Sequence, residues 1–186
     1  MAMEKRQKRW VHSATPALWG GAGLVLLLPL VAMQFTAEVA WTSSDFLVFG
    51  GMLFGACALY DLAKWRMAGN KAYRLGVGTA LAAAFLLVWV NLAVGIIGSE
   101  DHRANLMYGG VLAIGVAGAV IGRFRPLAMT RAMIATSLAQ ALASGVALIA
   151  GDGRAWILSS CFIVLWLASA GLFGRAAAAR GPSVSA

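Results

Sequence analysis

The chain has 186 residues, of which 61% are hydrophobic and only 12% charged, and its mean hydropathy is +0.79. A soluble domain is about half apolar and about one quarter charged. This composition therefore excludes a soluble protein and requires apolar surface that faces lipid. The net charge of +8 does not indicate a nucleic-acid partner, because the lysines and arginines lie in short clusters between apolar runs, as membrane topology requires.

Six apolar runs are long enough to cross a hydrocarbon core of about 30 Å, which takes about 20 helical residues. We therefore predict an all-α fold, a polytopic membrane helix bundle with six transmembrane helices within residues 17–174. Residues 1–16 are predicted to form a basic cytoplasmic N-terminus, and residues 175–186 a flexible cytoplasmic tail. The predicted helices are Ala17–Phe35, Phe46–Ala63, Leu75–Gly98, Leu106–Gly122, Leu127–Ala150 and Trp156–Gly174.

The first helix follows a basic segment and in this respect is similar to a signal peptide. Cleavage after Ala40 would place Glu38 where a small residue is required, so we expect this helix to remain in the protein. Apart from Arg103 and Arg154, every lysine and arginine lies before helix 1, after helix 6, between helices 2 and 3 or 4 and 5, or, for Arg131, near the start of helix 5. Since cytoplasmic loops carry the positive charge, we predict a multi-pass membrane protein with both termini cytoplasmic.

Proline and glycine positions predict where individual helices bend, begin and end. Pro29 lies inside the first helix and is expected to kink it. Pro126 is expected to open the fifth helix, because the first helical residue does not need a backbone donor. Gly151 is expected to end the fifth helix and Asp152 to cap the sixth.

Two segments are similar enough to suggest an internal repeat. Residues 45–66 align without gaps to residues 104–125, with six identities that include two consecutive glycines. Because two helices return the chain to the same side of the membrane, such a repeat would be parallel. The alternative is chance similarity, since membrane composition alone also produces identities.

Small residues at helical spacing predict close packing between helices. Gly51 and Gly55 lie four residues apart in the second helix, as do Gly118 and Gly122 in the fourth. We expect static packing surfaces, and the alternative is a mobile gate or an oligomer interface. Alanines at four-residue spacing place the fifth helix inside the bundle.

Two amides and one carboxylate lie within the predicted membrane segments, where lipid offers no hydrogen bonds. We expect Asn91 and Gln140 to bond to neighbouring helices, and the alternative is that they line a polar path for a substrate. Asp61 is a candidate proton or cation site. Lys64, one turn later, favours instead an ion pair near the membrane interface.

The loop between the third and fourth helices contains Glu100, Asp101 and His102. We expect its acidic residues to cap the fourth helix and to complement the positive end of that helix. The alternative is a periplasmic metal or proton-entry site. Three consecutive side chains diverge, so a metal would need ligands from other loops.

Several activities lack the residues that they require. His12 and His102 are separated by a membrane span of about 30 Å, so they cannot both ligate one haem. All four lysines lie on the predicted cytoplasmic side, and no helix carries an arginine ladder. Phosphate-loop, HExxH and catalytic-triad patterns are missing from the sequence. We therefore expect no enzyme, no cofactor and no metal.

The segment Trp89–Gly110 has the sequence WVNLAVGIIGSEDHRANLMYGG. It resembles a recurring segment of small, uncharacterised bacterial inner-membrane proteins. The resemblance implies a protein of the bacterial inner membrane, and it implies no activity and no site residues.

Three functional hypotheses follow from the sequence. In the first, the protein moves a small solute or ion along a path near Asn91 and Gln140. In the second, it is a non-catalytic structural or accessory subunit of a larger membrane complex or of a homo-oligomer. In the third, its basic cytoplasmic face senses lipid or stress.

Overall fold

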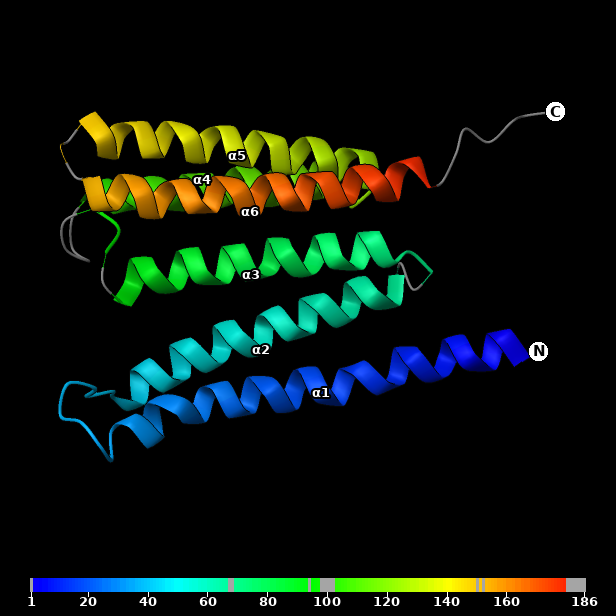
Figure 1. Cartoon of the computed structure of the whole chain (residues 1–186), viewed down its shortest axis with the longest axis horizontal. Helices are drawn as coiled ribbons and strands as arrows, with labels where there is room; N and C mark the ends of the chain where they lie inside the picture. The colour runs from blue at the N-terminus through cyan, green and yellow to red at the C-terminus, as the bar shows by residue number, and fades with distance from the viewer. Residues whose placement is uncertain are drawn as a thin grey trace. The chain divides into compact units, whose positions relative to one another are not determined.

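The computed structural model describes residues 2–66, 69–93, 95–97, 103–149, 151 and 153–179, with the side chains of residues 2–15 and 66 outside this description (Figure 1). Within these residues the chain is entirely helical, with six α-helices and one short 3-10 helix, as predicted. These elements are α1 (Ala2–Ala32), α2 (Ser43–Arg66), α3 (Lys71–Ala93), η1 (Arg103–Asn105), α4 (Leu106–Ile121), α5 (Pro126–Ile149) and α6 (Gly153–Ala178).

The chain divides into two compact units, Met1–Ala68 and Gly69–Ala186. The first unit contains α1 and α2, which pack against each other. The second unit contains α3, η1, α4, α5 and α6, and forms a bundle of four α-helices.

Five of the described helical segments are long and apolar enough to cross a membrane: α2, α3, η1 together with α4, α5, and α6. The apolar part of α1, Pro16–Ala32, is shorter. It reaches only about 25 Å at a rise of about 1.5 Å per residue. The number and length of these helices identify a multi-pass membrane protein.

Several helix boundaries differ from the predicted ones, among them the start of α1 and the ends of α3 and α6. α1 begins at Ala2 and continues without a break through Pro16 and Pro29. α3 ends at Ala93, before the predicted Gly98, because Gly95 has a φ of +71° that no α-helix accommodates. α6 continues past the predicted end to Ala178, through a run of alanines that favours helix.

Two predicted helix boundaries are confirmed. Pro126 is the first residue of α5. Gly151 follows α5 with a φ of +79°, and its N–H donates to the carbonyl of Leu148 at 3.0 Å. This is the left-handed glycine that commonly ends a helix and satisfies a carbonyl of its last turn.

The core of the second unit lies along α5 and α6. α5 packs against α4 and α6, and α6 packs against α3, as Figure 1 shows. In the most apolar stretch of α5, 44% of the residues are buried, a larger share than in any other candidate span. The predicted interior position of this helix is therefore confirmed. Lipid supplies no hydrophobic drive between helices, so their association depends on close packing through small side chains. The alanines and serines of α5 allow this packing.

The two segments of the suggested repeat differ in their helix bounds. α2 is one continuous helix to Arg66, whereas the matching segment starts in η1 and its helix α4 ends at Ile121. Left-handed residues at Arg123 and Phe124 produce the earlier end. The repeat stays a prediction.

Candidate functional site

A buried polar cluster lies between α5 and α6. Gln140 and Ser159 are completely buried, and Ser144 is 3% exposed. The Nε2 of Gln140 donates to the Oγ of Ser159 at 2.9 Å and to its backbone carbonyl at 3.2 Å. The Ser144 hydroxyl lies 2.8 Å from the Ser159 Oγ and 3.0 Å from the Gln140 carbonyl. The cluster therefore links the two central helices by side-chain hydrogen bonds.

The position of Ser159 sets the orientation of the Gln140 amide. A backbone carbonyl can only accept, so the NH₂ group of Gln140 must face Ser159. The Oε1 of Gln140 consequently points elsewhere, and it is a buried acceptor with no hydrogen bond to any described residue. One turn earlier, the Thr136 hydroxyl donates to the carbonyl of Ala132 at 2.9 Å, within its own helix.

Asn91 belongs to a second cluster, at the end of α3 that leads to η1. Its Nδ2 donates to the backbone carbonyl of Asn105 at 3.1 Å. The Asn105 Oδ1 accepts from the N–H groups of Ile97 at 2.9 Å and Ile96 at 3.2 Å. The Asn105 Nδ2 donates back to the Ile97 carbonyl at 3.2 Å. These bonds fasten the segment after α3 to the start of α4.

Asn91 and Gln140 therefore enter separate hydrogen-bond clusters. The partner of Asn91 lies in η1 and the partners of Gln140 lie in α6. The structure does not join the two amides through hydrogen bonds between described residues. Each amide bonds to a neighbouring helical segment, as expected from the sequence.

Asp61 connects the two helices of the first unit. The indole N–H of Trp19 on α1 donates to its Oδ2 at 2.8 Å, and Lys64 lies 3.5 Å from its Oδ1. The Trp19 ring also stacks on Phe54, with centroids 5.8 Å apart. The expected pair with Lys64 is present, and the carboxylate ties α1 to α2. Asn91 and Gln140 belong to the other unit.

The two glycine pairs have different surroundings. A Cβ added at Gly118 would lie 2.7 Å from the Cβ of Ala132, and one at Gly122 would collide with Ala128. Both glycines therefore permit the close approach of α4 to α5. Around Gly51 and Gly55, no described atom lies within 4 Å of an added Cβ.

The loop residues Glu100, Asp101 and His102 lie outside the described residues, as does Asp152. In the part of the chain that the structure describes, no three or more His, Cys, Asp and Glu side chains come together as a metal site.

Three residues of these clusters are not among the sequence-derived candidates: Asn105, Ser144 and Ser159. The spacing of Ser144, one turn after Gln140, is a signal that identifies it. Asn105 directly precedes α4, where asparagine often caps a helix, yet its side chain binds the preceding segment instead. Ser159 has no local signal, because its role depends on the register of α6 against α5.

Comparison of the chain with protein-family models, with curated proteins and with solved structures yields no match. The functional conclusion therefore rests on the geometry of the chain itself.

Proposed function

We propose that the chain is a non-catalytic structural or accessory protein of the bacterial inner membrane, which works within a homo-oligomer or a larger complex. The observation that carries this proposal is the use of both intramembrane amides in internal hydrogen bonds. Asn91 donates to Asn105, and Gln140 donates to Ser159. Donors that would otherwise face a passing solute are occupied in the resting protein.

The energetics support the same interpretation. A polar group without a partner in lipid is costly, whereas each interhelical bond in a membrane bundle contributes about 0.6–2 kcal/mol. Because the amides bond in two separate clusters, they stabilise two different helix contacts. This arrangement suits a rigid membrane component.

The proposed location and orientation rest on the charge pattern. The lysine and arginine clusters favour cytoplasmic termini, and the resemblance of Trp89–Gly110 supports the bacterial inner membrane.

One observation favours solute or ion transport as a second candidate. The Oε1 of Gln140 is a buried acceptor without a hydrogen bond in the described part of the chain. An unsatisfied acceptor inside the bundle suits a cation or a hydrogen-bond donor that passes through it.

Purification in a mild detergent distinguishes the two candidates. We expect the tagged chain to elute at a mass above one copy, with a companion of fixed stoichiometry or further copies of itself. We also expect Gln140→Leu to lower the melting temperature, and Leu138→Ala, at an exposed position of α5, to leave it nearly unchanged. A stable monomer with solute flux into proteoliposomes that Gln140→Leu abolishes and Leu138→Ala preserves would overturn the accessory role.

A further inference from the structure

Six cationic side chains gather at one end of the α3–α6 unit, among the residues described there. Two hydrogen bonds show that the start of α3, the α4–α5 turn and the end of α6 meet at this end. The Asn70 Nδ2 donates to the Ala176 carbonyl at 3.2 Å, and the Tyr73 hydroxyl donates to the Phe124 carbonyl at 2.8 Å. The cationic residues are Lys71, Arg74, Arg123, Arg125, Arg131 and Arg175. We name them the basic end.

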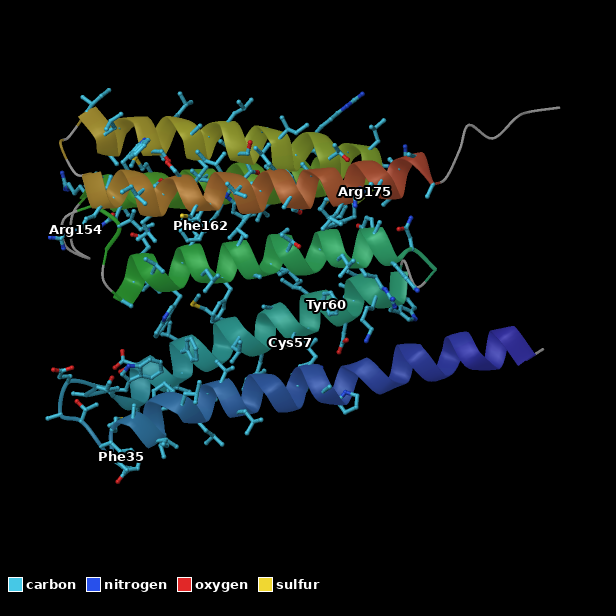
Figure 2. The ribbon with its side chains drawn as sticks, in the orientation of Figure 1. Phe35, Cys57, Tyr60, Arg154, Phe162 and Arg175 are labelled. Atoms are coloured by element: carbon cyan, nitrogen blue, oxygen red, sulfur yellow. The ribbon has the colours of Figure 1, made fainter. Side chains whose placement is uncertain are left out.

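The described residues of this unit include no carboxylate side chain that could pair with the basic end. The acids of residues 69–186 are Glu100, Asp101 and Asp152. These three acids lie outside the residues that the structure describes. Figure 2 shows Arg154 and Arg175 toward the two opposite ends of α6. α3 alone has 23 residues, about 34 Å of helix at about 1.5 Å per residue.

Asp61 of α2 is engaged within its own unit. The Asp61 carboxylate accepts from Trp19 and pairs with Lys64, within the first unit. Among the described residues of the α3–α6 unit, the cations of the basic end therefore have no acidic side chain to pair with.

The α4–α5 turn holds two of these cations in a fixed backbone. Arg123 and Phe124 have φ values of +49° and +57°, which side-chain-bearing residues seldom adopt. The Tyr73 bond to the Phe124 carbonyl and the bond from the Phe124 N–H to the Ala119 carbonyl, at 3.0 Å, hold this conformation. Arg123 and Arg125 are exposed on either side of Phe124, whose side chain is 46% exposed. In the sequence, two exposed arginines thus stand on either side of an exposed aromatic residue.

Arg74 adds a donor that is shielded from solvent. Its Nε is buried and makes no hydrogen bond with a described residue. A guanidinium presents five N–H donors and no acceptor, so an anionic oxygen is the group that satisfies it. Phosphate oxygens suit this geometry, because arginine binds them through paired hydrogen bonds.

We propose that the basic end of the α3–α6 unit binds the phosphate headgroup of an anionic phospholipid. The helices of this unit cross the membrane, so their ends lie at headgroup depth, where phosphodiesters are the abundant anions. The exposed Phe124 ring enters the interfacial layer between the two arginines. This inference is independent of the accessory role, because it concerns the isolated chain and its lipid.

Native mass spectrometry of the full chain tests the proposal, with an equimolar mixture of dioleoyl phosphatidylglycerol and dioleoyl phosphatidylcholine. We expect the wild-type chain to retain the anionic lipid preferentially. Arg123→Gln combined with Arg125→Gln should lower this preference roughly 10-fold to 30-fold, since each cation near anionic lipid raises the affinity by a factor of about 3 to 5. The matched control is Arg103→Gln with Arg154→Gln, two exposed arginines at the opposite end, which should leave the preference unchanged.

Three outcomes would overturn the proposal. The first is a wild-type chain with no preference for the anionic lipid, a result that does not depend on the folding of any variant. The second is an equal loss in both double variants, which would indicate a general charge effect. The third is displacement of the lipid by millimolar glycerol 3-phosphate, which would identify a site for soluble phosphate.

Discussion

The two units of the chain use different means to hold helices together. In the first unit, the α1–α2 contact uses the Trp19 ring on Phe54 and the bond from Trp19 to Asp61, whose carboxylate is partly exposed. In the second unit, α5 and α6 share the buried Gln140–Ser159 bonds. The second unit also relies on glycine contacts between α4 and α5.

This difference indicates where the chain tolerates change. A partly exposed contact that loses one partner can rebond to water or lipid headgroups, so its loss costs little. A buried contact that loses one partner leaves the other unsatisfied, which costs about 1–3 kcal/mol for each group. We therefore expect α3–α6 to be the sensitive unit and α1–α2 the tolerant one.

The largest expected effect is at Asn105. Asn105→Ala removes three hydrogen bonds to the buried backbone of Ile96 and Ile97 and should lower the free energy of unfolding by roughly 2–4 kcal/mol. Denaturant unfolding in detergent, followed by tryptophan fluorescence, measures this loss. Thr42→Ala removes the exposed hydrogen bonds between the Thr42 hydroxyl and Asp45 at the start of α2, and it should cost only about 1 kcal/mol. Equal losses at the two sites would remove the distinction between the units.

The next effect concerns glycine. Gly118→Ala should cost about 1–3 kcal/mol, because the new methyl group lies 2.7 Å from the Cβ of Ala132 and α4 must move. Gly51→Ala occupies open space in α2 and should be neutral or slightly stabilising, since alanine favours helix by up to about 1 kcal/mol. Thermal unfolding of both variants tests this contrast. A destabilised Gly51→Ala would show that α2 is closely packed in the protein.

A smaller effect is expected for the Gln140 cluster. A double-mutant cycle of Gln140→Leu and Ser159→Ala should give a coupling free energy of about 0.6–2 kcal/mol. The two single variants and the double variant are unfolded in the same detergent. A coupling near zero would mean that the hydrogen bond makes no contribution to stability.

The smallest effect is expected at Trp19. Trp19→Phe keeps an aromatic ring against Phe54 and loses only the N–H donor to Asp61, so its cost should be about 1 kcal/mol or less. Hydrogen exchange read by mass spectrometry should show faster exchange in peptides of α1 and α2. Exchange in α5 should be unchanged, and faster exchange there would contradict separate units.

The sequence predicts the helices well, because five of the six apolar runs form helices with the length that a membrane span requires. Pro126 and Gly151 also mark their helix ends correctly, since each has a backbone preference that acts locally. The predicted end of α3 lies too late in the chain, because apolar residues continue beyond the last helical turn. Gly95 is the local signal that corrects this boundary.

The sites are less predictable, because they depend on how distant segments meet. Gly51 and Gly118 have the same spacing to a second glycine, yet only Gly118 faces a neighbouring helix closely. Asn91 and Gln140 stand out as amides in apolar runs, but their partners Asn105 and Ser159 follow from chain reversal and helix register. Sequence spacing does not determine either.

The central claim is that the polar residues inside the α3–α6 unit are closed to water. Cysteine labelling tests it most directly, with Ser159→Cys in a chain whose Cys57 and Cys161 are replaced by alanine. The exposed control is Arg154→Cys, on the same helix. We predict that a membrane-impermeant cationic thiosulfonate applied from both sides labels only the thiol at position 154 in the folded chains, and labels both positions after denaturation with dodecyl sulfate. Labelling at position 159 in the folded protein, at a rate close to that at position 154, would reveal an aqueous path and contradict the account.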